Sequence, residues 1–280
     1  MILRDYLRSY LDLYSEDGNR WSPRVQANMR WSLSRLAEEF GDAPLEDLPP
    51  MRSWAVDQSA ATVKHGRTAI NDAVRDRLTT FNPLAQIRKS EGRGSADVRP
   101  MDEDELEALI TSANHLTSPA IAQAIRFAGY TGVRQGETLA LQYGDLHGST
   151  ATIERSFADG KVVPPKSGVS REIFVPARAG LPERPTPSTI DSDLIWPDLA
   201  PHVLRREFKT ALLELERPEL FDLTWHSLRH SAATMLLERG ASSEDVAMQL
   251  GHRDGGALVR TRYGHPSVEG TLNRLSRCWQ

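Results

Sequence analysis

The stretch that decides the fold of this chain runs from Thr224 to His265 and reads TWHSLRHSAATMLLERGASSEDVAMQLGHRDGGALVRTRYGH. Its first part carries apolar residues, Leu228 and Met235 among them, at helical spacing. Ser242 or Ser243, followed by two acids, is typical of the start of a second helix, and Gly251 is typical of its end. His252 therefore comes directly after a helix end, where a side chain can be held rigidly against a neighbouring site.

Five side chains of this stretch can donate to a phosphate or carry its protons: His226, Arg229, His230, His252 and His265. His226 and Arg229 are three residues apart, so we expect both on one face of the first helix. An arginine can grip a phosphoryl group with two N–H donors, histidines can supply protons, and the phenol of Tyr263 can attack phosphorus. Each residue alone is more often structural, but the whole set predicts phosphoryl transfer onto a tyrosine.

Length and composition set the class of protein. With 280 residues the chain is long enough for two domains, and 39% apolar with 26% charged residues is typical of a soluble globular protein. No apolar run is long enough for a membrane span, and the charged start is unlike a signal peptide. The single cysteine, Cys278, cannot form an internal disulfide, which favours a reducing, cytoplasmic setting. Because the net charge is -4, any DNA-facing surface must come from charge arranged on particular helices.

The first 88 residues are predicted to form helices only. An amphipathic pattern covers residues 2–14, Ser22-Pro23 is typical of a helix start, and residues 59–79 form another helix. The apolar stripes expected to pack are Val25, Met29, Leu33, Leu36 and Phe40, then Val63, Ile70, Val74, Leu78 and Phe81. The polar stripes beside them are Arg24, Asn28, Trp31 and Arg35, then Lys64, Arg67, Asn71 and Arg75. These polar stripes suit a DNA backbone and groove, although a solvated helix face is the commoner explanation of one such stripe.

Residues 89–100, KSEGRGSADVRP, have no apolar period and are predicted to be a linker to a second domain over residues 101–280. Asp102 with Glu105, and Ser118 with Pro119, are typical of two helix starts. Arg134 follows a glycine turn and opens a short helix, where the helix dipole favours bound anions. Glu137 is expected to orient Arg134 or the backbone turn.

Short β-branched runs over residues 151–156, 161–163 and 171–175 predict one small antiparallel sheet, with Lys166 at a hairpin tip between the last two strands. A helix over residues 201–216 should follow. The fold class is therefore mainly α with a small antiparallel sheet in the second domain. Tyr130 and Tyr143 lie in apolar patterns and are expected in the core, which leaves Tyr263 as the attacking tyrosine of this half.

The ordered motifs resemble those of the tyrosine recombinases, the phage integrases and their relatives, over nearly the whole chain. TGVRQGETLALQYGDL (residues 131–146) is similar to the first arginine box and PPKSGVSRE (164–172) to the segment of the hairpin lysine. HSLRH (226–230) is similar to the His-x-x-Arg box, LGH (250–252) to the second histidine motif, and the Tyr263 segment to the nucleophile motif, at an interval after His252 about two residues longer than usual. The resemblance implies six active-site residues: Arg134, Lys166, His226, Arg229, His252 and Tyr263.

The resemblance also implies partners and chemistry. The expected partner is a double-stranded DNA recombination site, clamped between the core-binding and catalytic domains of a minimal recombinase without an arm-binding domain. Strand exchange would use a homotetramer and a directionality factor, with no metal and no cofactor. The 3′-phosphotyrosine intermediate would serve phage or mobile-element integration and excision. The alternatives are chromosome dimer resolution, a type IB topoisomerase and an inactive DNA-binding regulator.

Overall fold

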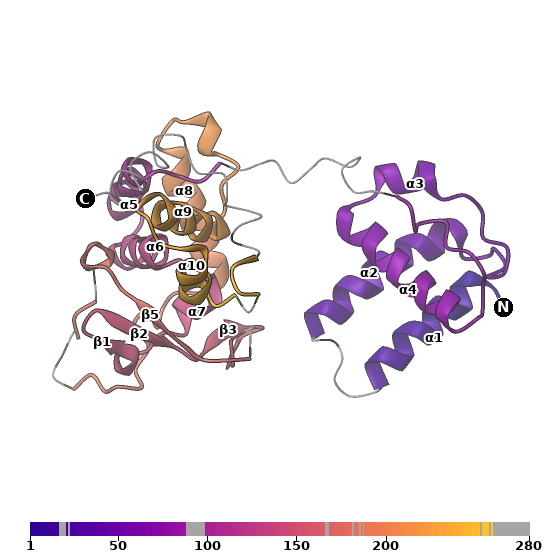
Figure 1. The fold of residues 1–280 in the computed structure, drawn as a ribbon, viewed down its shortest axis with the longest axis horizontal. Coiled ribbons are helices and arrows are strands. Elements are labelled where there is room, and N and C mark those ends of the chain that lie inside the picture. Colours follow the sequence, from indigo (N-terminus) through magenta and orange to yellow (C-terminus); the bar gives the residue numbers. More distant parts are fainter. Residues whose placement is uncertain are drawn as a thin grey trace. The chain divides into compact units, whose positions relative to one another are not determined.

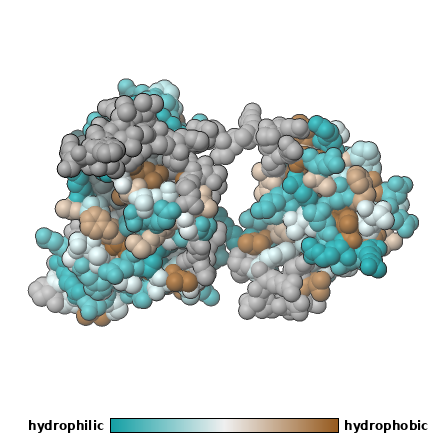
Figure 2. Space-filling view, in the orientation of Figure 1, coloured by the Kyte–Doolittle hydropathy of each residue, from teal (hydrophilic) through white to brown (hydrophobic). Residues whose placement is uncertain are grey.

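A computed structural model gives the structure of residues 1–16, 21, 23–87, 99–165, 168–180, 182–184, 186, 188–252, 254–257 and 259. The chain divides into two compact units, Met1–Asp97 and Val98–Gln280, called the first and the second unit below (Figure 1). Within the described residues no helix is both long and apolar enough to cross a membrane. The visible face of each unit is largely hydrophilic, with scattered hydrophobic residues (Figure 2).

The first unit consists of the helices α1 (Leu3–Glu16), α2 (Pro23–Phe40), α3 (Arg52–Asp57) and α4 (Ala60–Arg75). Its core is built from the predicted stripes, with Met29, Leu33, Leu36, Val63 and Ile70 almost fully buried. The Tyr6 hydroxyl also donates to the carbonyl of Ala69 at 2.7 Å, which ties α1 to α4. Burial of these stripes supplies most of the stability of the unit.

Three members of the predicted apolar stripes are exposed, which corrects that prediction: Val25 at 40%, Leu78 at 42% and Phe81 at 62%. The helix ends at Arg75 and not at Thr79, and Arg77 adopts a left-handed φ of 61°. Leu78 and Phe81 therefore lie beyond the helix, where the helical period no longer places residues on the core face.

The second unit begins with α5 (Glu103–Leu116), α6 (Pro119–Thr131) and α7 (Gln135–Leu139) and ends with α8 (Pro201–Leu213), α9 (Trp225–Glu238) and α10 (Ser243–Leu250). The predicted helix starts are confirmed. Asp102 and Glu105 form a capping box, Ser118 caps α6 ahead of Pro119, and Ser242 caps α10. The helix predicted over residues 201–216 ends earlier, at Leu213.

Helix α9 packs against α6 on one side and α10 on another. Its buried residues include Trp225, Leu228, Ala232 and Met235, and they are spread over most of its circumference. Because more than half of its residues are buried, α9 lies in the core of the second unit, in contact with α6 and α10.

Within the described residues the strands form two sheets and not the single sheet predicted. Strands β1 (Leu146–His147), β2 (Thr150–Ile153) and β5 (Arg171–Phe174) are antiparallel in the order β1-β2-β5, with Ala151 opposite Ile173. Strands β3 (Ser156–Ala158) and β4 (Lys161–Val163) pair separately. The predicted strand 151–156 is thus split in two. Strands β4 and β5 belong to different sheets, so they do not pair with each other as predicted; Lys166 itself lies outside the described residues.

Candidate active site

Arg134 is placed by a tight turn at the end of α6. Gly132 has a left-handed φ of 73°, and a Cβ atom on it would lie 2.4 Å from Cδ2 of Leu250. Only glycine allows both the turn and this close approach of α10. Arg134 is then the N-cap residue directly before α7, half-buried, with its guanidinium beside the Glu137 carboxylate.

Glu137 is a fully buried carboxylate that binds two arginines. Its Oε1 accepts from Nη1 of Arg134 at 2.8 Å, and its Oε2 accepts from the Arg134 backbone N–H at 2.9 Å. Arg171 donates to both carboxylate oxygens, at 3.1 and 2.7 Å. Burial alone would raise the pKa of Glu137, but the hydrogen bonds and charges of Arg171 and Arg134 lower it to about 2. The carboxylate is therefore charged and holds Arg134 by both its main chain and its side chain.

Arg229, on α9, is buried with 2% of its surface exposed. Its Nη1 donates to the carbonyl of Gly132 at 2.9 Å, and its Nη2 donates to the carbonyl of Leu250 at 2.6 Å. Both carbonyls belong to helix ends, where such groups lack partners within the helix. Arg229 therefore joins the ends of α6 and α10 at one point.

His252 contacts the same guanidinium, with its Nε2 2.9 Å from Nη2 of Arg229. Because arginine has only donors, Nε2 must be the acceptor and Nδ1 must carry the proton. Burial and the charges of Arg229 and Arg134 lower the pKa of His252 to about 4, so the ring is neutral near pH 7. Among the described residues the buried Nδ1 has no hydrogen-bond partner.

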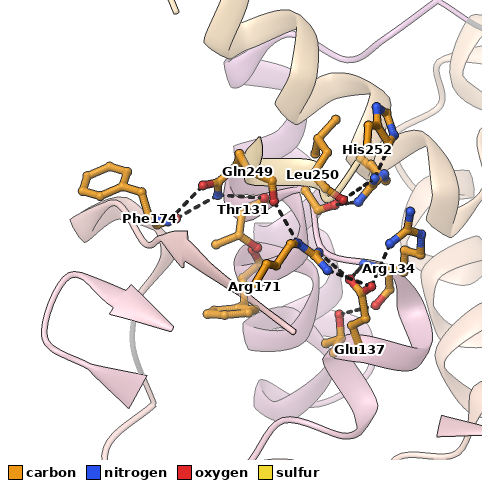
Figure 3. A network of polar contacts seen from close by, with 12 residues as sticks. Thr131, Arg134, Glu137, Arg171, Phe174, Gln249, Leu250 and His252 are labelled. Atoms are coloured by element: carbon orange, nitrogen blue, oxygen red, sulfur yellow. Dashed lines mark hydrogen bonds and ion pairs between the residues drawn. The ribbon is translucent and has the colours of Figure 1, made fainter. Parts of the chain in front are cut away.

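Gln249 connects this cluster to the sheet. Its amide nitrogen donates to the carbonyls of Thr131 and Phe174, and its amide oxygen accepts from the Phe174 backbone N–H. Figure 3 shows the resulting network, in which Arg171 lies between Glu137 and the end of α10. Arg134, Arg229 and His252, which come from three separate motifs, are held in one cluster.

His226 is exposed, unlike Arg229. His226 lies on the exposed side of the first turn of α9, and its ring is 4.7 Å from that of His230 in an edge-to-face arrangement. His226 and Arg229 are three residues apart on α9, as expected for one helix face, but His226 is exposed whereas Arg229 is buried. Because the surrounding elements cover most of α9, Arg229 points into the unit although it is only three residues from His226.

Lys166, Tyr263 and His265 lie outside the described residues. Tyr130 and Tyr143 are buried, as predicted, with 6% and 9% exposure. The Tyr130 hydroxyl donates to Glu107 at 2.6 Å and to Glu103 at 3.1 Å, and burial together with these carboxylates raises its pKa. Such a phenol is far from ionisation, which makes Tyr130 unsuited to attack a phosphate.

Six of the seven residues predicted to bind DNA are exposed on the first unit: Arg24, Asn28, Arg35, Lys64, Asn71 and Arg75. Arg67 differs from them. It is half-buried, and its guanidinium donates to the carbonyls of Leu84 and Ile87 at 3.0 and 2.5 Å. These bonds anchor the segment that follows α4, so Arg67 has a structural role that the charge pattern did not indicate.

Arg171 and Gln249 belong to this site although the sequence did not predict them. Arg171 begins a short strand and looks like an ordinary exposed strand residue in the sequence, whereas its side chain is only 9% exposed. The signal in the sequence was the need of the Glu137 carboxylate for positively charged partners. A buried Glu137 needs compensating positive charge, and Arg171 lies in the segment PPKSGVSRE (164–172), five residues after Lys166.

Comparisons with known proteins show which proteins this chain is similar to. Residues 199–269 match the family model described as the phage integrase family. The chain is 30% identical over 271 residues to the prophage phiRv2 integrase of Mycobacterium tuberculosis, which covers 86% of this chain and 70% of that protein. A shorter match, 40% identical over 58 residues, covers 21% of this chain and 16% of the tyrosine recombinase XerC of Bifidobacterium longum.

Solved structures show the same fold. The Tn1549 transposon integrase in complex with a circular intermediate DNA superposes with a TM-score of 0.78 at 15% identity, over 99% of both chains. The lambda integrase tetramer bound to a Holliday junction gives a TM-score of 0.66 at 19% identity, over 91% of this chain and 78% of that chain.

Proposed function

From the premise that this chain belongs to the phage integrase family of tyrosine recombinases, we propose that its Arg134–Arg229–His252 cluster binds the phosphate that Tyr263 attacks. The carrying observation is that Arg134 and Arg171 share the Glu137 carboxylate, while Arg171 and Arg229 bind the neighbouring carbonyls of Gln249 and Leu250 and Arg229 also contacts His252. Val259 supports the assignment of Tyr263, because it is buried against α9 and α10. Tyr263 follows four residues later in the sequence.

The electrostatics of the cluster fit attack by a phenol. A tyrosine pKa of about 10 means that forming the phenolate near pH 7 costs about 4 kcal/mol, and nearby cations offset part of that cost. Arg134 and Arg229 supply two positive charges that also neutralise the nonbridging oxygens in the transition state. Neutral His252 adds its Nδ1–H as a hydrogen-bond donor, because its Nε2 is already engaged by Arg229.

The proposed step forms a bond from the Tyr263 oxygen to phosphorus and breaks the bond from phosphorus to the 5′-oxygen. Lys166 is the proposed acid that protonates the leaving 5′-oxygen, and His226 the proposed base for the phenol proton. The 3′-phosphotyrosyl ester conserves the bond energy. A 5′-hydroxyl of another strand can therefore reverse the step and reseal the DNA without ATP.

We propose phage or mobile-element integration and excision as the biological task, with a homotetramer on two double-stranded sites and a directionality factor as partners. The similar structures support this, since they are those of a transposon integrase on circular intermediate DNA and of an integrase tetramer on a Holliday junction. Chromosome dimer resolution is the second candidate for the biological task.

A covalent capture experiment tests the assignment. Purified protein is mixed with a pool of nicked duplexes with randomised centres, and complexes that survive denaturant are isolated and their DNA sequenced. The adduct should map to Tyr263, and Tyr263→Phe, which loses only the hydroxyl, should bind a captured duplex but form no adduct. A phosphate on Tyr130 or on a serine, or an adduct with the Phe variant, would refute the assignment. Holliday junctions formed from two captured sites distinguish a recombinase from a topoisomerase, and absence of any adduct would indicate a binding protein.

A further inference from the structure

Arg171 contacts the residues that hold Arg134 and Arg229 in place, and no role has yet been given to it. It donates to both oxygens of Glu137, and its Nε donates to the carbonyl of Gln249 at 3.2 Å. Gln249 and Leu250 form the last turn of α10, and the Leu250 carbonyl binds Arg229. One guanidinium thus contacts the carboxylate that holds Arg134 and the helix end that holds Arg229.

The backbone is shaped around this side chain. Gly251 has a left-handed φ of 71°, and a Cβ atom on it would lie 2.8 Å from Cδ and 2.9 Å from Nε of Arg171. His252 is the next residue. The side chain of Arg171 therefore fills the space under the turn that presents His252, and the turn needs glycine both for its conformation and for this contact.

The strand that carries Arg171 is itself fixed to α10. The Gln249 amide makes two bonds to the main chain of Phe174, at the other end of β5. Strand β5 is thereby held at both ends against α10, and the guanidinium has little room to shift. Rigid support of this kind is what a catalytic cation needs, because a displacement of about 1 Å can cost about 100-fold in rate.

We propose that Arg171 is a positioning residue, which acts through Glu137 to hold Arg134 at a fixed distance from Arg229 and His252. This inference rests on the proposed function of the cluster. It adds that strand β5 sets the geometry of the phosphate site. Arg171 does not touch the phosphate; without it, Glu137 keeps Arg134 as its only side-chain cation and Arg134 loses its fixed position.

The test compares two DNA substrates in single-turnover cleavage. One is a captured duplex with a normal scissile phosphate, and the other carries a methylphosphonate there, which lacks one negative charge and depends less on a well-placed arginine. For Arg171→Gln we expect phosphate cleavage to slow by about 10- to 100-fold and methylphosphonate cleavage, for each diastereomer, by less than about 3-fold. Loss of folded protein would lower both rates equally, so the ratio of the two rates reports positioning and not stability.

Arg99→Gln is the matched control. Arg99 also binds a buried carboxylate with two N–H donors, to Glu105 at 2.8 and 2.5 Å, and Glu105 keeps a second arginine, Arg217, as Glu137 keeps Arg134. This variant should leave the rate ratio unchanged. Arg171→Lys keeps the charge but cannot span two oxygens and a carbonyl, so it should fall between wild type and Arg171→Gln. It also carries the test if Arg171→Gln does not fold.

A double variant checks the route of action. In an Arg134→Ala background, Arg171→Gln should slow phosphate cleavage by less than about 3-fold further, because the residue it positions is gone. An unchanged rate ratio in Arg171→Gln, or losses that multiply in the double variant, would overturn the inference while the wild type still forms its adduct. A wild type that forms no adduct with any duplex would instead refute the proposed function and this inference with it.

Discussion

Replacement of Glu137 by Gln should destabilise the second unit by about 3 kcal/mol near pH 7. The size follows from the pKa: a carboxylate whose pKa falls from 4.5 to about 2 on folding contributes about 3 kcal/mol above its unfolded pKa. The geometry supports a similar loss of stability. The variant leaves Arg171, whose side chain is 9% exposed, without its counter-charge, and breaking a buried ion pair costs about 3–5 kcal/mol.

The pH dependence gives a second, independent check. Since the folded pKa of Glu137 is depressed, its contribution is fully present above about pH 4.5 and is lost as the pH falls through about 2. Protonated Glu137 resembles glutamine. The difference in the free energy of unfolding between wild type and Glu137→Gln should therefore be about 1 kcal/mol smaller at pH 4 than at pH 7.

Urea unfolding of fluorotryptophan-labelled protein, followed by fluorine NMR, measures the free energy of unfolding of the second unit separately from that of the first. Trp196 and Trp225 are buried in the second unit and give signals separate from those of the first unit. Glu172→Gln is the control, because Glu172 is an exposed carboxylate next to Arg171, and its change should stay within about 0.5 kcal/mol. A loss below about 1 kcal/mol for Glu137→Gln, or a loss that does not change with pH, would refute the ion-pair reasoning.

Three further outcomes are expected. Replacing Lys64 and Arg75 by Ala should reduce the salt slope of DNA binding by about 2, since each lost phosphate contact removes about 0.9 from it, and an unchanged slope in a titration would show a merely solvated face. In an NMR titration, the His252 ring should protonate near pH 4, as burial and the charges of Arg229 and Arg134 dictate; a midpoint above about 6 would contradict this environment. A chain ending at Pro266 should still cleave a captured duplex but should not recombine two sites. The reason is that Val268, Leu272 and Leu275 have the spacing of an apolar helix face, which we expect to dock on a neighbouring protomer. Intact recombination by the shortened chain would disprove this docking.

Features that depend on residues a few positions apart could be predicted from the sequence. The capping pair Asp102 and Glu105, the cap of α6 at Ser118 and the end of α10 at Gly251 are all confirmed. Each is a hydrogen bond or a backbone conformation confined to one helix turn, so the local residues alone determine it. The ordered motifs were sufficient for the family, because together they carry the chemistry of one reaction.

Features that depend on residues far apart in the chain were decided by the tertiary structure. Arg171 and Glu137 are 34 residues apart, and Arg229 and Gly132 are 97 apart. No spacing rule predicts such pairs, since they exist only once α9 and α10 have packed. The same limit explains why Arg229 is buried although His226 is exposed, and why β4 does not join the sheet of β5. Side-chain burial is a property of the whole packed unit, whereas helix caps are a property of the chain segment that contains them.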